Sequence, residues 1–398
     1  MIIVAETAAR RTLLLPALLD AHWPLLRWAF VSGSREVVVL EEAGGEAEAG
    51  LRYIHNDMCY PCVLIAGQAL LALRSGKYDP RRTTLLIGQA GDACRGSCYV
   101  PLLRRALSQA GYPEVEVLGL NVRGLDPGGG LPITPPMLVR ALAAAVWGDT
   151  LLLLRNQVRP YESVPGAAQA AWESWVKILS GDLRRGKNLS PYGLCRRCRE
   201  MAASFRAVPT SKRAVRKVAL VGELYMKYCS LGNRGLDAYL AKQNCEIGVN
   251  GLTWYALYYL DSHGTEGPLP LRLGCRAAAK LGAGIQRRMI RALSDAGFVS
   301  LPAFPELKRQ AVSLSTCPLG DGWLITAEAA AWSRAGYRRI LAVQPFGCLP
   351  NHVCGRGLYA ALARSAPGVR IVSVDYDASI SDLTAKTRIQ MLLDDREL

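Results

Sequence analysis

The feature that most constrains the fold is a short apolar run near the C-terminus that ends in a stiff turn. Residues 340–343 (ILAV) lead into residues 344–352 (QPFGCLPNH), a turn rich in Pro and Gly with Cys348 at its tip. The run is too short and too apolar for a surface helix, so it predicts a buried strand. Ligands of open parallel sheets bind beyond the carboxyl ends of the strands. A cysteine at that place is either a ligand to a metal or a buried structural thiol.

Two other stretches repeat this arrangement. Residues 84–89 (TLLIGQ) form an apolar run that again ends in Gln, and the loop after it contains Cys94. Residues 56–62 (NDMCYPC) place Cys59 directly before an apolar helical pattern. Three cysteines on loops where a strand should meet a helix favour a metal site over three unrelated structural thiols.

Short apolar runs alternate with helical patterns along most of the chain, which predicts βαβ units and parallel sheets. Residues 13–30 are expected to form one or two helices, interrupted at Pro16 and Pro24. Helices are also expected after Cys59 and at residues 100–110. The strands are expected at residues 36–40, 84–89, 115–120, 218–221, 246–249, 340–344 and 369–374.

The fold class predicted from this order is α/β, with two Rossmann-like domains whose parallel sheets face a shared cleft. A mostly helical segment is expected at about residues 135–205, and a basic linker at residues 209–217. The domain boundaries that follow are 1–208 and 209–398.

The composition predicts a globular protein. Of the 398 residues half are hydrophobic and a fifth are charged. The most apolar stretch, residues 137–154, is interrupted by Arg140 and Asp149, and the apolar part near the N-terminus is interrupted by Asp20 and His22 with no small-residue cleavage site after it. We therefore expect a cytoplasmic protein without a membrane span or signal sequence.

The charge is strongly basic, with 48 Lys and Arg against 33 Asp and Glu. The basic residues are scattered, and no helix-turn-helix, zinc-finger or RNP-type pattern is present, so nucleic-acid binding is not predicted. A generally Arg-rich composition explains the charge. An anionic substrate or an acidic partner is the alternative.

The chain has twelve cysteines and only four histidines. In a cytoplasmic protein this favours metal or redox chemistry over disulfides, and it weakens a histidine-based catalytic zinc site. Cys195 and Cys198 form an isolated CxxC, which is a weak zinc signal and equally consistent with a surface or redox-active pair. Four further cysteines are expected to be structural: Cys229, Cys245, Cys275 and Cys317.

Several motifs resemble the 2-hydroxyacyl-CoA dehydratase superfamily, and in particular its acyl-CoA dehydratase activase-related and double-cubane cluster protein branch. The similarity runs in order over about residues 14–393. The motifs that carry it are residues 56–67 (NDMCYPCVLIAG), 90–99 (AGDACRGSCY), 221–223 (VGE), 322–328 (GWLITAE), 344–352 (QPFGCLPNH) and 375–377 (DYD).

The resemblance implies an oxygen-sensitive iron–sulfur protein of anaerobic metabolism that acts in electron transfer. It assigns Cys59, Cys94 and Cys348 as ligands of a [4Fe–4S] or double-cubane cluster. The neighbouring Cys62, Cys98 and Cys354 are additional ligands or plain core residues. Such a protein performs low-potential reduction or radical dehydration of a CoA thioester or small molecule, as an oxidoreductase or lyase component.

The resemblance also implies a partner that hydrolyses ATP and delivers electrons. This chain has neither a P-loop nor a Rossmann glycine motif, so we expect the activator to be a separate polypeptide. A homo- or heterodimer is compatible with the sequence. The alternative function is a non-catalytic iron–sulfur electron carrier or cluster scaffold.

Polar residues flank the three expected ligands. Gln89, Gln344 and Asn351, and also Asn56 and Arg95, either bind the cluster surroundings or satisfy the loop backbone. His352 is the first candidate for proton delivery, and Glu223, at the end of an expected strand, is the second.

Overall fold

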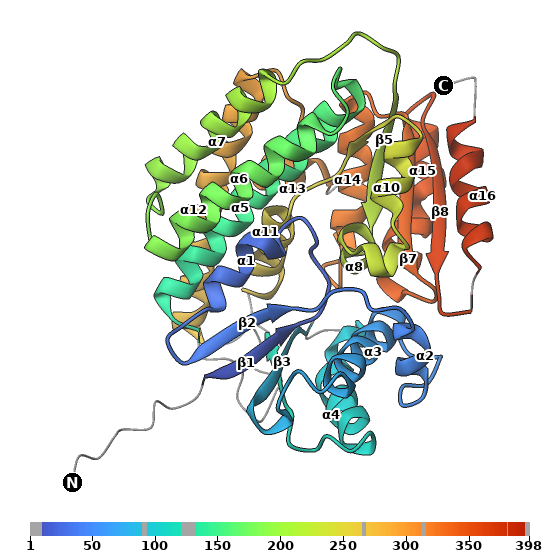
Figure 1. The fold of residues 1–398 in the computed structure, drawn as a ribbon. Helices are drawn as coiled ribbons and strands as arrows, with labels where there is room; N and C mark the ends of the chain where they lie inside the picture. The colour runs from blue at the N-terminus through green and yellow to red at the C-terminus, as the bar shows by residue number, and fades with distance from the viewer. Residues whose placement is uncertain are drawn as a thin grey trace.

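The computed structural model describes residues 10–89, 94–120, 133–264, 268–311, 316–379 and 381–394. It contains two four-stranded, wholly parallel sheets (Figure 1). The first has the order β2–β1–β3–β4 and is formed by β1 (Arg11–Leu15), β2 (Arg35–Val39), β3 (Thr83–Gly88) and β4 (Glu116–Leu120). The second has the order β6–β5–β7–β8 and is formed by β5 (Arg216–Gly222), β6 (Cys245–Gly248), β7 (Arg339–Pro345) and β8 (Arg370–Tyr376). The expected α/β class with two Rossmann-like sheets is confirmed.

One expected element is wrong. The sequence predicts helix across residues 13–30, but Arg11–Leu15 forms β1, which pairs with both β2 and β3. Only Trp23–Phe30 is helical, as α1. A short apolar run such as Leu13–Leu15 does not reveal by periodicity whether it is a buried strand or a helix. The run forms a strand because it lies between β2 and β3 in the sheet.

The other helices follow the strands as expected. In the first half they are α2 (Glu46–Leu51), α3 (Tyr60–Arg74) and α4 (Tyr99–Gln109), with the 3₁₀ turns η1 (Pro80–Arg82) and η2 (Arg95–Cys98). In the second half they are α8 (Leu224–Tyr228), α9 (Ser230–Asn233), α10 (Leu236–Lys242), α14 (Gly322–Arg334), α15 (Gly357–Ser365) and α16 (Asp382–Leu393), with the π-helical turn η4 (Asn351–Arg356).

A third layer consists of helices alone. The expected helical segment forms α5 (Pro135–Val158), α6 (Ala167–Arg185) and α7 (Pro191–Arg206), with the turn η3 (Arg159–Tyr161). From the second half of the chain, α11 (Leu252–His263) and α12 (Leu269–Asp295) pack against this segment, and α13 (Phe304–Ala311) packs against α11 and α12. The layer therefore combines segments from both sides of the expected boundary near residue 208 (Figure 1).

Helix α5 is the core of this layer. With the turn that follows it, Pro135–Tyr161 is the one helix within the described ranges that is long and apolar enough to cross a membrane, but 72% of its most apolar window is buried inside the protein. Such burial is typical of the core helix of a soluble protein.

Two of the four residues that interrupt apolar stretches in the sequence, His22 and Asp149, contact each other. Asp149, in the middle of α5, lies 2.8 Å from Nε2 of His22, and both side chains are fully buried. The same carboxylate accepts hydrogen bonds from the backbone N–H groups of Leu252 and Thr253, at 2.6 and 3.0 Å. Asp149 thus satisfies free amides at the start of α11 and joins three helices.

The loops after β3 and β7 meet, because Arg95 in the first loop donates a hydrogen bond to the carbonyl oxygen of Gly347 in the second. Gly222 illustrates how closely the backbone packs at this edge of the second sheet. Its φ is +118°, and a Cβ at this position would lie 2.1 Å from the carbonyl oxygen of Val343. Only glycine fits there, and the next residue, Glu223, is thereby directed beyond the strand.

Candidate metal centre

Cys59 lies at the beginning of α3. It is the residue before the first helical turn, and Pro61 occupies that turn, where a missing N–H costs nothing. Only 7% of Cys59 is exposed. Its side chain makes no capping hydrogen bond, but the free amides of the helix N-terminus nearby favour a thiolate or another negative group.

Cys94 precedes the turn η2, where its Sγ accepts a hydrogen bond from the backbone N–H of Gly96 at 3.4 Å. The first four residues of its motif, residues 90–93, lie outside the described residues. A Cβ added to Gly320 would lie 3.8 Å from Cβ of Cys94 and 2.4 Å from Cγ of Pro350. The Cys94 loop and the Cys348 loop therefore contact the same turn.

Cys348 lies in the loop after β7, and 6% of it is exposed. Its Sγ accepts a hydrogen bond from the side-chain amide of Asn351 at 3.3 Å. Its carbonyl oxygen accepts the backbone N–H of His352 at 2.9 Å, which begins the turn η4. The sulfur is thus held in place by the helical turn that follows it.

Arg95 connects all three cysteine loops. Its Nη1 donates to the carbonyl oxygen of Asp57 at 2.7 Å, in the loop that contains Cys59. Its Nη2 donates to the carbonyl oxygen of Gly347 at 2.8 Å, next to Cys348. Since Arg95 follows Cys94 directly, one guanidinium group fixes the relative positions of loops from both sheets.

The three thiols interact electrostatically. The pKa of Cys59 is raised well above its usual value, first by burial, then by the carboxyl group of Glu223 and by the neighbouring Cys348 and Cys94, while a hydrogen bond with Tyr99 lowers it. The pKa of Cys348 is raised by burial and by Glu223, and the contacts with Asn351 lower it. In the absence of a positive ion, both sulfurs are therefore held as thiols.

The three additional cysteines differ in position. Cys62 is fully buried in α3, where burial and then Cys98 raise its pKa to about 12. Cys98 is exposed at the end of η2, and Cys354 is buried within η4. Among them, Cys62 and Cys98 lie near enough to each other to interact.

The polar residues that flank the three cysteines mostly make hydrogen bonds to other residues of the loops and neighbouring strands. Gln89 donates to the carbonyl oxygen of Ser97 at 2.7 Å, and Gln344 donates to Oδ1 of Asp375 at 2.7 Å. Both ring nitrogens of His352 have neighbours, since Nδ1 lies 2.8 Å from the carbonyl oxygen of Cys348 and Nε2 lies 3.4 Å from Arg356. The expected role of His352 in proton delivery stays a prediction.

Glu223 is better placed for such a role. It precedes α8, and its carboxylate accepts the backbone N–H of Met226 at 2.9 Å. Burial and then the charge of Asp321 raise its pKa to about 8, although Lys227 and the backbone amides act in the opposite direction. A carboxyl group with this pKa still carries its proton at neutral pH.

Sequence reasoning missed a group of buried charges behind this site, which consists of Lys227, Asp321 and Glu328. Lys227 and Glu328 are both fully buried and form an ion pair of 2.7 Å. The only signal in the sequence was a charged residue within an apolar stretch, as in residues 224–228 (LYMKY) and 322–332 (GWLITAEAAAW).

Comparison with known proteins gives no assignment. No model of a known protein family matches the chain, and no curated protein has a significantly similar sequence. The resemblance to the dehydratase superfamily therefore stays a prediction.

The described residues include no group of three or more His, Cys, Asp or Glu side chains that could hold a single metal ion. The residue type is nevertheless the one that iron–sulfur clusters use, and Cys59 is close enough to Cys94 and Cys348 to interact with both electrostatically. Asn351, which donates to the sulfur of Cys348, is the kind of neighbour that stabilises a ligating thiolate.

Proposed function

We propose that the chain is an iron–sulfur protein in which Cys59, Cys94 and Cys348 bind a cluster between the two sheets. The observation that carries the proposal is the position of Arg95, whose guanidinium joins the loops of all three cysteines. Burial supports it as well, because Cys59 and Cys348 are only 7% and 6% exposed, and solvent exposure is one of the properties that set the potential of a cluster.

A bound cluster would supply one-electron chemistry at low potential. The residues of the chain would support that chemistry in separate ways. Asn351 would donate a hydrogen bond to the ligating sulfur of Cys348, and Glu223 would hold a proton beside the site. Cys62, Cys98 and Cys354 would provide additional thiols if the cluster is a double cubane.

We further propose that this site performs reduction or radical dehydration of a CoA thioester or small molecule in the cytoplasm. The electrons would come from a separate protein that hydrolyses ATP. Exposed apolar side chains next to Cys348 support a docking partner of this kind, since Phe346, Leu349 and Val353 are each more than half exposed. The alternative function is that of an electron carrier that catalyses no reaction, and the test below distinguishes the two.

The test is anaerobic purification followed by iron and sulfide analysis and an EPR spectrum of the reduced protein. We expect about four iron atoms and four sulfides per chain for one cubane, or about eight of each for a double cubane. Titration with acyl-CoA thioesters should then change the EPR signal. A protein that stays free of iron after anaerobic reconstitution contradicts the proposal, and an iron-loaded protein with no response to any thioester favours the electron carrier.

A further inference from the structure

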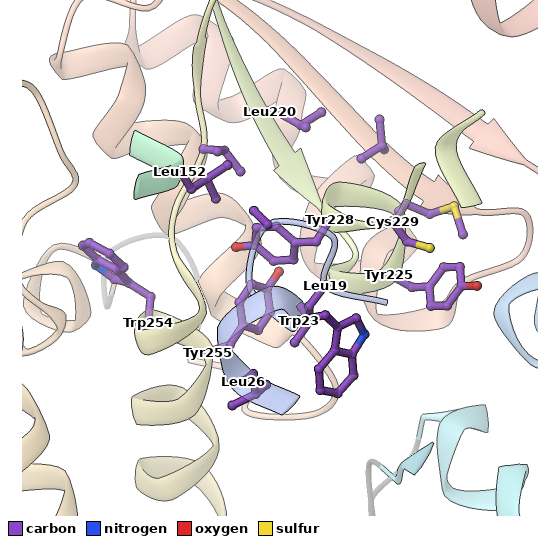
Figure 2. Packing of buried hydrophobic residues seen from close by; sticks show 14 of the residues in the cluster. Leu19, Trp23, Leu26, Leu152, Leu220, Tyr225, Tyr228, Cys229, Trp254 and Tyr255 are labelled. Atoms are coloured by element: carbon purple, nitrogen blue, oxygen red, sulfur yellow. The ribbon is translucent and has the colours of Figure 1, made fainter. Parts of the chain in front are cut away.

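A positive charge is buried at the carboxyl edge of the second sheet. Lys227 lies on α8, directly after β5, and its Nζ donates to Oδ1 of Asn250 at 2.5 Å and to Oε2 of Glu328 at 2.7 Å. The rings of Tyr228 and Tyr255 lie 5.5 and 4.6 Å from the same nitrogen. Figure 2 shows these two rings within the apolar packing around α8 and α11.

Stability does not explain this ion pair. Removing two charges from water costs several kcal/mol per ion, and apolar residues of similar size are often as stable or more stable in such positions. Glu328 is in addition incompletely bonded, since its Oε1 is buried and has no hydrogen-bond partner among the described residues. A buried carboxylate with one unsatisfied oxygen is ready to accept a proton.

The ion pair lies close to the cysteine site, because α14, which contains Glu328, packs against the turn η4 that follows Cys348. Lys227 interacts with Asp321 and Glu223 as well as with Glu328, and both Asp321 and Glu223 act on Cys348. Tyr359 on α15 is influenced by Glu328 and by Cys348 at once. A negative charge added at the cysteines would therefore be felt at Glu328.

The titratable groups that face Glu328 come from several elements. They differ in whether they can take up a proton near neutral pH. Glu223 already holds its proton near neutral pH and uses its carboxylate to bond backbone amides. Burial raises the pKa of Glu328 to about 7, while Lys227 lowers it. The groups that act on Glu328 or are influenced by it are Lys227, Asp321, Tyr228, Tyr255 and Tyr359.

We propose that Glu328 takes up one proton from solvent each time the cysteine site accepts one electron, with Lys227 as the residue that positions it. The inference rests on the proposed iron–sulfur function. The electron comes from a reduced one-electron donor protein, which is oxidised, and the proton converts the Glu328 carboxylate to the neutral acid. The added electron and the added proton leave the net charge of the buried region unchanged, which is the least costly way to reduce a site that excludes water.

The test is the reduction potential of the iron-loaded protein, measured by electrochemical titration at several pH values around 7. For the wild type we expect the potential to fall as the pH rises, with close to one proton taken up per electron. Glu328→Gln should remove most of this pH dependence while the iron content stays unchanged.

Glu246→Gln is the matched control. Glu246 is also a buried glutamate of the second sheet, but it lies on β6 and bonds to the hydroxyls of Tyr161 and Tyr337, each at 2.6 Å. The carboxyl groups that shift the pKa of Cys59 and Cys348 are those of Glu223 and Asp321, not that of Glu246. Its replacement should leave the pH dependence as in the wild type.

Redox-difference infrared spectroscopy provides a measurement that does not need a folded variant. Reduction of the wild type should produce the carbonyl band of a newly protonated carboxyl group. If no such band appears, or if iron-loaded Glu328→Gln keeps the pH dependence of the wild type, the role of Glu328 is wrong while the cluster stands. A wild-type protein without iron overturns the proposed function and this inference together.

Discussion

Two groups of cysteines in this protein lie in different parts of the fold. Cys195 and Cys198 lie three residues apart on α7, so both face the same side of that helix, and both are buried against the helical layer. The thiol of Cys198 accepts a hydrogen bond from Thr150 at 3.4 Å, and burial raises its pKa to about 12. Cys59, Cys94 and Cys348 instead lie on loops at the ends of sheets, close to buried charges.

The comparison shows that spacing in the sequence is a poor guide to where a cysteine lies in this fold. The CxxC pair is the more familiar motif, yet its surroundings are those of core residues. The loop cysteines are far apart in the chain, but Arg95 donates hydrogen bonds to the backbone of their loops and Asn351 donates one to the sulfur of Cys348.

The largest change in the free energy of unfolding is expected at the buried ion pair of Lys227 and Glu328, next to the loop region. Lys227→Met leaves Glu328 buried without its partner, and we expect the free energy of unfolding to fall by about 3–5 kcal/mol. Lys308→Met removes the half-exposed partner of Asp261 and should cost about 0–1 kcal/mol. Chemical denaturation of both variants measures the difference, and equal losses would contradict the account of the buried pair.

The free energy of unfolding should depend on pH because of Glu223, which lies in the loop region. The folded pKa of Glu223 is raised from 4.5 to about 8, so its contribution to stability is fully present below pH 4.5 and is lost as the pH rises toward 8. Relative to the iron-free wild type, Glu223→Gln should therefore gain on the order of 1 kcal/mol per pH unit across this window. Denaturation curves at pH 5, 6, 7 and 8 test the slope, and a constant difference between the two proteins would refute it.

The sequence was sufficient for most of the fold because its strands are short apolar runs bounded by turns. It was not sufficient for Arg11–Leu15, where an apolar run followed by Pro16 suits a helix and a strand equally. The loops of Cys59, Cys94 and Cys348 were predicted to meet, and the structure joins them through Arg95.

The buried charges could not be paired from sequence. Lys227 and Glu328 are 101 residues apart, and His22 and Asp149 are 127 residues apart. Local patterns reveal only that a charge interrupts an apolar stretch. Which charge it meets depends on how α8 packs near α14 and how α1 packs on α5, and these contacts are tertiary.

A smaller effect is expected in the helical layer. Cys198→Ala removes one buried sulfur between α5 and α7 and should lower the free energy of unfolding by about 1 kcal/mol. Its iron content should equal that of the wild type, because the proposed ligands lie elsewhere. A loss of iron in this variant would show that the two groups of cysteines are not separate.

The most direct test of the central claim compares Cys348→Ser with Cys275→Ser after anaerobic reconstitution. The two cysteines are matched, since each is 6% exposed, but Cys348 lies in the loop after β7 and Cys275 lies within α12. The account predicts that Cys348→Ser loses most of its bound iron and its EPR signal, while Cys275→Ser keeps both. Full iron and an unchanged signal in Cys348→Ser would contradict a cluster held between the two sheets.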